Sequence, residues 1–458
     1  MAISSLLSVA GGALLSQQTA INIAGANIAN VNTAGYSRQQ AVMSAVGSVD
    51  ALSGFSRLGV EVTGIQRAYD QFLADRIAVQ KQNVGYAEAR ESALEGVQVI
   101  FNDASGALGD AMNNFWNAWD DLSLNPDGQL ERENLLDASE RLTVSFHEAA
   151  SSLISARDEA EARISDAVGG VNGILSGIAQ LNSRITAADV QNISVNSLRD
   201  QRVELINELA GYMDISYFEN ADGSVNVYMG SGQTLVEGND SRQLSLQSDP
   251  ANGFYSDIVL SGGSQTVVTG GISSGRIGAL LEIRDSVIPG YLDRLNTLAT
   301  TLADAVNTQH QAGYDANGNA GENFFDPSAD AATLAINAAI AADIDRIAAS
   351  STAGGSDGEN ARQIAAINED ALINDATLGD SYAAMIGQIA LDLNNAGSAA
   401  DRQSLVMDQL ITMRDTVSGV SLDEEMIQLM KFQLGYNAAA RLTQTVNEML
   451  DVLMNLGQ

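Results

Sequence analysis

The stretch that decides the fold is the amino-terminal run of residues 1–38, MAISSLLSVAGGALLSQQTAINIAGANIANVNTAGYSR, in which Arg38 is the first charged side chain. Apolar residues recur in it at alternating steps of four and three, and a mean step of about 3.5 residues is typical of a coiled-coil helix. Gly35 then favours helix termination. The sequence therefore predicts one long helix whose repeat positions are Ile3, Leu7, Ala10, Leu14, Gln17, Ile21, Ala24, Ile28 and Val31.

The other faces of this helix are also uncharged and carry mostly Ser, Asn, Gln, Thr, Ala and Gly. A solvated helix usually has charged residues on its outer side. We therefore interpret the segment as one that packs into something larger than its own chain. The alternative is an ordinary buried helix inside a single globule.

The carboxyl-terminal end predicts a second long helix. Ser421-Leu422-Asp423-Glu424 forms a capping box, and the acidic residues of the first turn complement the helix dipole. We expect the two end helices to pair into one terminal coiled coil. The apolar stripe predicted on the second helix is Ile427, Met430, Leu434, Ala438, Leu442, Val446, Met449, Leu453 and Leu456.

Between the ends the sequence predicts a helical rod with a β-rich insertion, hence a mainly α fold. Alternating apolar residues on both sides of the turn 220–223 predict a hairpin near Ile215–Val227. The domains expected are 1–40 with 418–458 (terminal coiled coil), 41–211 with 273–417 (helical rod) and 212–272 (β-rich subdomain). Helices are expected in the middle at about 69–101, 115–119, 129–190, 194–210, 276–311, 360–367 and 381–414.

Composition excludes several classes of function. The 458 residues carry 57 acidic and 23 basic side chains, a net charge of −34, which disfavours nucleic acid and anionic membranes as partners. The absence of cysteine excludes disulfides and thiolate chemistry. No basic residue precedes the apolar run Leu6–Leu15, so we expect an export route other than a Sec signal.

Two local patterns suggest chemistry, and each has a simpler explanation. Gly271-Ile272-Ser273-Ser274-Gly275 matches the nucleophile elbow G-x-S-x-G, but the strand–helix alternation of a hydrolase is missing. The segment Asp315–Asp326 partly resembles a calcium loop, although its sixth position is Ala320 and its last is not Glu. We expect no catalytic residue, cofactor or metal, and the weak calcium-like loop stays open as an alternative.

Several motifs resemble those of one protein family. The run 26–36, ANIANVNTAGY, resembles the amino-terminal signature of flagellar rod, hook and hook-associated proteins. The continuation 36–39 and the segment 418–425, SGVSLDEE, resemble the hook-associated protein 1 family in particular. Interior blocks at 198–202, 278–285 and 313–318 are similar to the same family and occur in the same order.

The resemblance implies a structural subunit, not an enzyme, that joins hook to filament and assembles into a ring. It implies a domain built from both termini that lines the export channel and is disordered in the free monomer. Implied partners are further copies, the hook protein, a second hook–filament junction protein, an export chaperone and the type III export apparatus. Longer relatives carry an outer β-rich domain after the segment matching Asn323-Phe324-Phe325, and it is expected to be absent or vestigial here.

The residues expected to carry assembly lie in the signature, on the two end helices and at the start of the second one. Rivals are a hook or rod subunit, a secreted hydrolase using Ser273, and a helical adhesin or toxin-like export substrate. The expected assembly residues are Ile3, Leu7, Leu14, Ile21, Asn27, Ile28, Asn30, Val31, Thr33, Gly35, Tyr36, Ser37, Arg38, Ser421, Asp423, Glu424, Met426, Leu429, Leu434, Tyr436, Leu442, Val446, Met449, Leu453 and Leu456.

Overall fold

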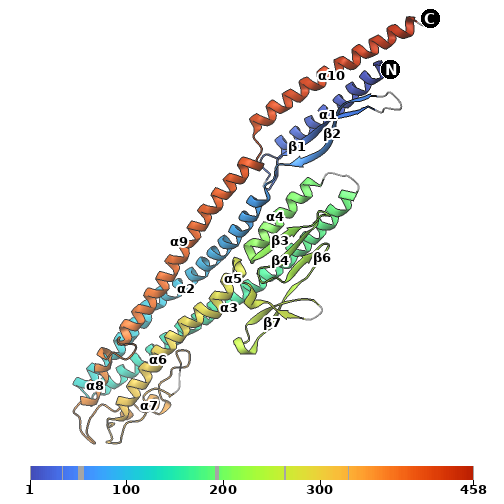
Figure 1. Ribbon diagram of the computed structural model, residues 1–458. Helices are drawn as coiled ribbons and strands as arrows, with labels where there is room; N and C mark the ends of the chain where they lie inside the picture. Colours follow the sequence, from blue (N-terminus) through green and yellow to red (C-terminus); the bar gives the residue numbers. More distant parts are fainter. Residues whose placement is uncertain are drawn as a thin grey trace. The chain divides into compact units, whose positions relative to one another are not determined.

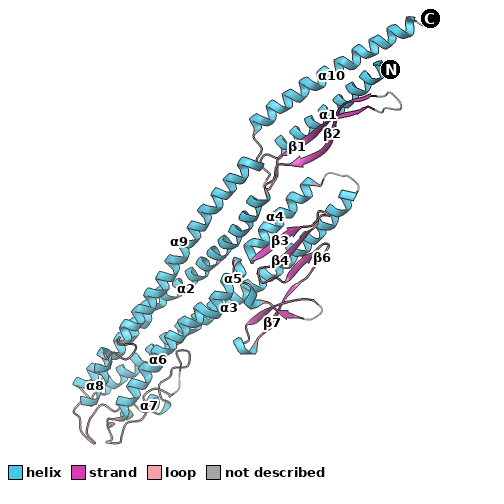
Figure 2. Cartoon of the chain, in the orientation of Figure 1, coloured by secondary structure: helices cyan, strands magenta, loops and turns pink. Residues whose placement is uncertain are grey.

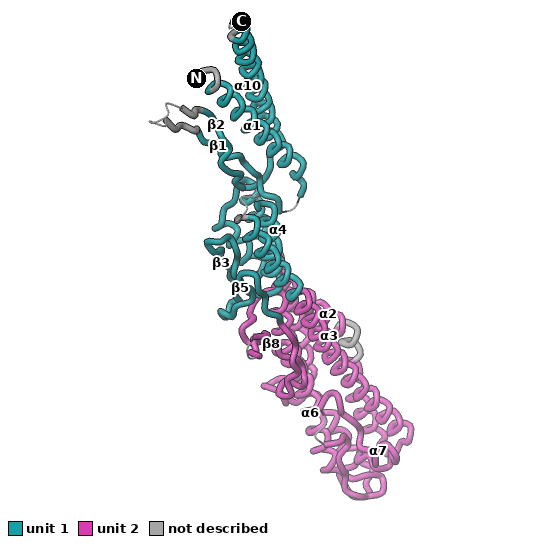
Figure 3. The backbone as a smooth tube through the Cα atoms, turned by 90° about the vertical axis from the view of Figure 1, so that its right-hand side faces the viewer, with its two compact units in different colours: residues 1–82, 171–243, 404–458 teal, residues 83–170, 244–403 magenta. Residues whose placement is uncertain are grey.

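Long helices make up most of the computed structural model, which describes residues 2–33, 35–49, 56–190, 195–262, 265–327 and 330–456 (Figures 1 and 2). The chain forms two compact units (Figure 3). Unit 1 comprises residues 1–82, 171–243 and 404–458, and unit 2 comprises residues 83–170 and 244–403. The long helices are α1 (Ala2–Ala29), α2 (Gln71–Leu124), α3 (Gln129–Val190), α4 (Asn196–Tyr212), α6 (Ile288–Gln311), α9 (Leu378–Ser418) and α10 (Leu422–Leu456).

In unit 1, the two end helices α1 and α10 lie side by side, as the sequence predicts (Figure 1). A hairpin of β1 (Gln39–Val49) and β2 (Ser56–Arg67) also packs on α1. Its strands are antiparallel, and the register runs from Gln39 opposite Arg67 to Val49 opposite Ser56. A Cβ on Gly12 of α1 would lie 3.3 Å from the Val60 carbonyl oxygen, so a glycine permits this close contact. The helical rod was expected to begin at residue 41, whereas Gln39–Val49 and Ser56–Arg67 form strands, because these β-prone runs pair with each other and cover α1.

The rest of unit 1 holds a four-stranded antiparallel sheet in the order β3-β4-β5-β6, formed by Ile215–Glu219, Val225–Met229, Thr234–Glu237 and Asp240–Ser241. The predicted hairpin is confirmed in β3 and β4. Two buried polar side chains fasten the sheet to the helices. Asn182 of α3 donates to the carbonyls of Val225 and Gly238, and Arg202 of α4 donates to Asn182 and to the Gly223 carbonyl.

Unit 2 surrounds an aromatic core. Phe115 of α2 contacts the rings of Phe324 and Phe325, and Trp119 of α2 contacts Phe324 and His310 of α6. Both tryptophans, Trp116 and Trp119, are buried in this unit. The remaining elements of the unit are the sheet β7 (Leu244–Ser248), β8 (Ser256–Leu260) and β9 (Thr266–Val267), with helices α5 (Gly275–Glu282), α7 (Ala338–Ala342) and α8 (Glu359–Ala366).

Two expectations about elements need correction. Residues 69–101 and 115–119 were expected as separate helices, but α2 is one helix from Gln71 to Leu124, since the buried residues Phe101, Leu108, Met112 and Phe115 continue one helical spacing between them. The stretch 212–272 contains two separate sheets, the first in unit 1 and the second in unit 2. The mainly α fold class with paired end helices and a β-containing insertion is confirmed. The division into three domains stays a prediction.

Candidate assembly site

A buried polar junction stands where the chain leaves α1. Asn27, buried in the last turns of the helix, donates from Nδ2 to the Gln39 carbonyl at 2.9 Å and to Glu425 Oε2 at 3.0 Å. Its Oδ1 accepts from the Tyr36 hydroxyl at 2.8 Å and from the Gln39 backbone N–H at 3.0 Å. One amide therefore joins α1, the signature segment, β1 and α10, and every one of its hydrogen-bonding positions is used.

Arg38 extends the junction to the start of α10. Its Nη1 lies 2.8 Å from Glu424 Oε2, and its Nε lies 3.4 Å from Oε1 of the buried Glu425. Its backbone N–H donates to the Ser418 carbonyl, and its carbonyl accepts from the Ala68 N–H. The first charged residue of the chain thus pairs with two carboxylates and holds together the three chain segments that meet at this point.

Ser37 connects the signature to α4. Its backbone N–H and its hydroxyl both donate to the Asp200 carboxylate, at 3.2 Å and 2.9 Å. Arg67, at the end of β2, donates to the same carboxylate at 3.0 Å. Burial raises the pKa of the neighbouring Tyr36, and the nearby Asp200 and Glu425 carboxylates raise this pKa further, so the hydroxyl stays a donor at any physiological pH.

A polar cleft of about 530 Å³ lies beside this junction. Gly35 makes the turn at its wall with φ of +75°, and a Cβ there would lie 3.2 Å from Glu204 Oε2. The signature residues that line the cleft are Asn30, Val31, Asn32, Thr33, Gly35, Tyr36 and Arg38, and the lining also includes Ser421, just before α10, and Glu424 of α10. The signature therefore has two roles, a buried side that fastens α1 and an open side that borders this cleft.

The capping box holds in only one direction. The Ser421 hydroxyl accepts from the Glu424 N–H at 3.5 Å. Glu424 was expected to reach back to the cap, and it instead accepts from Arg38. Glu424 pairs with Arg38 and not with the Ser421 backbone N–H, because a hydrogen bond between two charged groups is stronger than one to a neutral donor.

The rotation of α10 differs from the prediction. One set of half-buried or buried residues recurs every seven positions from the junction, at Glu425, Phe432, Ala439 and Val446. Midway along α10, Gly435 faces Gln17 of α1, and a Cβ on Gly435 would lie 2.9 Å from Gln17 Cδ. Gln17 therefore faces α10, as its place in the predicted repeat of α1 requires. Asn27 and Arg38 hold Glu425 inward, and this fixes the rotation of α10. The residues at intervals of seven from Glu425 therefore face the interior of unit 1. Of the stripe expected to pair with α1, Val446 is buried, whereas Ile427, Met430, Leu434, Ala438, Leu442 and Met449 are exposed, so for these six the expected pairing is wrong.

The other expected assembly residues occupy mixed positions. On α1, Leu7 is exposed and Ala10 and Ala24 are buried, while Leu14, Ile21, Ile28 and Val31 are half-buried. On α10, Asp423, Met426 and Tyr436 are exposed, and Leu429 is half-buried. The side chains of Ile3, Leu453 and Leu456 lie outside what the structure describes.

Sequence reasoning missed three members of the junction as site residues. Asp200 and Arg67 are distant in sequence and meet only in the fold, and Glu425 was assigned to the helix dipole rather than to a buried pair. The block 198–202 was the available signal for Asp200, since it carries two arginines around one aspartate on a helix.

The patterns that suggested chemistry have structural explanations. Asp315 Oδ1 accepts from the backbone N–H groups of Asn317 and Asn319, and its Oδ2 accepts from the Asn319 side chain, so its oxygens hold a turn. Within the described ranges, no cluster of three His, Asp or Glu side chains could hold a metal ion. Ser273 lies against Gly278, where a Cβ would approach its backbone carbon to 2.9 Å, so this serine belongs to the tight entry into α5.

His310 is likewise structural. Its Nδ1 pairs with the Glu322 carbonyl, and its Nε2 accepts from the Ala348 N–H at 2.8 Å, which requires the neutral ring. Burial lowers its pKa to about 4. In the part of the chain that is described, no helix combines the length and apolar character that crossing a membrane requires.

Comparison with known proteins places the chain among flagellar proteins. Residues 94–325, half of the chain, match the family model described as flagellar hook-associated protein FlgK helical domain. The chain belongs to the FlgK family. Residues 7–36 match the flagella basal body rod protein model, and residues 416–456 match the flagellar basal body rod FlgEFG protein C-terminal model. The two rod-type matches cover α1 with the signature and α10.

Relatives of the FlgK family match over nearly the whole chain. Flagellar hook-associated protein 1 of Escherichia coli (strain K12) is 27% identical over 99% of this chain and 100% of its own length. The protein of that name from Bacillus subtilis (strain 168) is 28% identical over 98% of this chain and 97% of its own. The flagellar hook junction protein FlgK from Burkholderia pseudomallei shares the fold, with a TM-score of 0.69 at 15% identity over 75% of this chain and 100% of that one.

These matches identify the chain as a structural component of the bacterial flagellum, with a role in motility. The FlgK family is structural and not enzymatic, so the hydrolase alternative based on Ser273 is wrong.

Proposed function

We propose that the chain joins the flagellar hook to the filament and assembles into a ring as its terminal helices order and pair. Relatives named hook-associated protein 1 and hook junction protein support this role. The observation that carries the proposal is the exposed apolar stripe of α10. The helix that lies beside α10, α1, has no charged residue.

Most of the stripe of α10 is exposed in the part of the chain that the structure describes. Ile427, Met430 and Leu434 follow one another at helical spacing, and Leu434 is 71% exposed. Contiguous apolar surface of this kind marks interaction sites in soluble proteins. Further copies are the occupants to which the proposal commits, because α1 offers neighbours exposed Leu6, Leu7 and Leu15 and no charge to desolvate.

The packing of α1 on α10 is too light to order both helices unaided. The buried residues of the two helices are largely small, with Ala10, Ala20 and Ala24 on α1 and Ala439 on α10. Ordering costs about 1–2 kcal/mol per residue in backbone entropy. Neighbouring copies that cover the α10 stripe supply the missing apolar burial, so ordering and assembly occur together.

The proposal extends to location and partners. A ring at the hook–filament junction would contact the hook protein on one side and a second junction protein on the other, and its terminal helices would line the channel. Delivery by the flagellar type III export apparatus with a chaperone is part of the same proposal. The polar cleft next to the signature is open to a neighbouring copy.

The test places a charge on the stripe. Leu434→Glu leaves the fold of the free chain intact, because the side chain is exposed, and it should abolish attachment of filaments. Cells carrying it should lose motility and shed flagellin into the medium. The matched control Gln444→Glu adds the same charge at an exposed polar position of α10 and should keep motility. Full motility of the Leu434→Glu strain would contradict the proposal.

A further inference from the structure

The methionines of the chain divide into two sets by exposure. In one set every side chain is at most 5% exposed, and its members are Met112, Met213, Met229, Met385 and Met407. In the other set the side chains are 45% to 72% exposed, and all lie between residues 413 and 454. We call this second set the terminal methionines: Met413, Met426, Met430, Met449 and Met454. Among the methionines whose side chains the structure describes, only the half-buried Met43 belongs to neither set.

Four of the terminal methionines lie on the exposed surface of α10. Met430 follows Ile427 and precedes Leu434 at helical spacing, and both of these apolar neighbours are exposed as well. Met426 lies one turn before Met430, so the two thioethers are neighbours on the helix. Methionine is flexible and polarizable, and it adapts to neighbours of different shape. In the free chain, these sulfur atoms are open to solvent and to small reagents dissolved in it.

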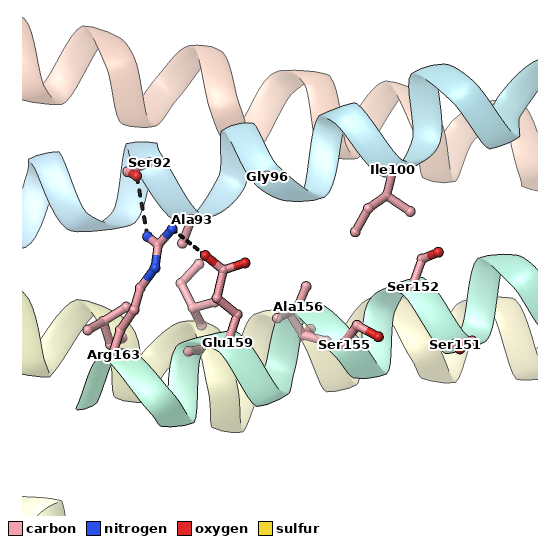
Figure 4. Close-up of a pocket in the computed structure, with 14 residues that line it drawn as sticks. Ser92, Ala93, Gly96, Ile100, Ser151, Ser152, Ser155, Ala156, Glu159 and Arg163 are labelled. Carbon is pink, nitrogen blue, oxygen red and sulfur yellow. Dashed lines mark hydrogen bonds and ion pairs between the residues drawn. The ribbon is translucent and has the colours of Figure 1, made fainter. Parts of the chain in front are cut away.

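Other groups that oxidants attack are missing from the chain or shielded. The chain has no cysteine, and both tryptophans are buried in unit 2. A groove of about 300 Å³ lies between α2 and α3 of that unit, and its small and apolar side chains surround the Arg163–Glu159 ion pair (Figure 4). None of the described residues that line this groove is a methionine. Exposed sulfur on the described surface is therefore concentrated at the terminal methionines.

We propose that the terminal methionines are a modification site, at which a peroxide oxidises the thioethers to sulfoxides and thereby blocks assembly. At each site the sulfur lone pair attacks one oxygen of hydrogen peroxide, an S–O bond forms and the O–O bond breaks. The sulfur is oxidised by two electrons, and the peroxide is reduced to one water that keeps both hydrogens. Hydrogen peroxide is uncharged, so the net charge of −34 does not repel it as it repels an anionic oxidant.

The added oxygen changes what the surface of α10 can bury. A sulfoxide is polar, and its formation disrupts interfaces rich in methionine. The oxygen on Met430 would have to be buried among apolar side chains when a neighbouring copy covers the stripe, which is unfavourable without a hydrogen-bond donor. Methionine sulfoxide reductases reverse the oxidation, so the block is reversible. The inference rests on the proposed assembly through α10, and it adds a chemical control of that surface.

Peptide mass spectrometry and hook binding test the inference together. The purified full-length chain is treated with hydrogen peroxide, catalase removes the excess, and the chain is added to hooks isolated from a strain that lacks it. We expect the terminal methionines to gain one oxygen each about tenfold faster than the buried set, and hook binding to fall about tenfold. Methionine sulfoxide reductases for both sulfoxide epimers should restore the binding.

The matched control replaces all the terminal methionines by leucine, with Met413→Leu, Met426→Leu, Met430→Leu, Met449→Leu and Met454→Leu in one chain. Leucine keeps an apolar surface of similar volume and accepts no oxygen. This variant should bind hooks equally well before and after peroxide treatment. Circular dichroism before and after treatment checks that the helix content of both chains is unchanged.

The inference is overturned, while the proposed function stands, if the oxidised natural chain binds hooks as well as the untreated chain. It is also overturned if the buried methionines are oxidised as fast as the terminal ones, or if the leucine variant loses the same binding on treatment. A failure of the reductases to restore binding overturns it without reference to the variant. If the untreated natural chain does not bind hooks, both the inference and the proposed function fail.

Discussion

At the scale of single residues, Asn27 shows how the signature works. Its side chain bonds to Tyr36, to both backbone groups of Gln39 and to Glu425, so it fixes where the chain turns and where α10 begins. An aspartate could not donate to Glu425, and a leucine could make none of these bonds. The residue type follows from the four partners around it.

Replacing Asn27 by Leu should weaken the assembled joint. The substitution keeps the approximate volume but leaves the buried Glu425 carboxylate and the Gln39 backbone with fewer partners, which costs about 2–4 kcal/mol. The readout is the urea concentration that releases the chain from isolated hook–filament complexes. Thr19→Ala removes a local bond to the Leu15 carbonyl and should shift the release far less. Equal shifts for the two variants would argue against the junction.

Because His310 is buried in its neutral form, we expect the free energy of unfolding of unit 2 to depend on pH. Its pKa is about 4 in the folded protein and about 6.5 when unfolded. Between these values the unfolded chain binds a proton that the folded chain does not, so the free energy of unfolding falls by about 3 kcal/mol as pH drops from 6.5 to 4. Above pH 6.5 this residue contributes no pH dependence.

Fluorescence can follow this change, because Trp116 and Trp119 are the only tryptophans and both belong to unit 2. Denaturation midpoints measured at several pH values should fall more steeply for the natural chain than for His310→Gln between pH 6.5 and 4. Parallel curves in that window would refute the assignment of a neutral buried histidine.

At the scale of elements, the rotation of α10 is set at its first turn. Glu425 is held inward by Asn27 and Arg38, and each seventh residue after it then faces the interior of the terminal domain. The more hydrophobic stripe is left outside, which is the reverse of the rule for a two-helix coiled coil. Such an arrangement suits a helix whose main partners belong to other copies.

The contact of Gly435 with Gln17 offers a test of the α1–α10 pairing. Gly435→Leu should push the helices apart and impair assembly, whereas Gly435→Ala should be nearly neutral, because a gain of about 1 kcal/mol in helix propensity offsets the displacement of Gln17. Adding Gln17→Ala to Gly435→Leu should restore part of the loss. The check is incorporation into hook–filament complexes, and an absence of rescue would mean that the two residues do not face each other there.

At the scale of the whole molecule, the two units differ in what holds them. Unit 2 has a core of large aromatic residues, including Phe115, Trp119, Phe324 and Phe325. The terminal part of unit 1 relies on alanines and on one polar junction. The stability of the chain is therefore uneven, and the least stable part is the one proposed to meet other copies.

Amide hydrogen exchange should reveal this difference. In a dilute free chain, amides of α1 and α10 should exchange much faster than those of α2 around Trp119, because the terminal helices lack most of their partners. In assembled complexes the same amides should become protected. Firm protection of both end helices in the free chain would contradict assembly-coupled ordering.

Deleting residues 1–38 should separate folding from assembly. The deletion removes α1, Asn27 and Arg38 but leaves the aromatic core of unit 2 and the Arg67–Asp200 pair. We expect tryptophan fluorescence and helix content of the remainder to persist while incorporation is lost. Filament attachment by the truncated chain would disprove a need for the terminal pairing.

The sequence by itself determined the long end helices, the β3–β4 hairpin and the family, because periodicity, turn residues and local motifs depend on near neighbours along the chain. Only the tertiary structure decided which face of α10 turns inward, that β1 and β2 cover α1, and that Asp200, Arg67 and Glu425 join the signature. These features arise from hydrogen bonds and ion pairs between residues up to several hundred positions apart, as between Asn27 and Glu425. The apolar pattern of α10 could not reveal which of its faces turns inward. The contacts of the buried Glu425 with Asn27 and Arg38 at the first turn outweigh the preference of the apolar stripe for the interior.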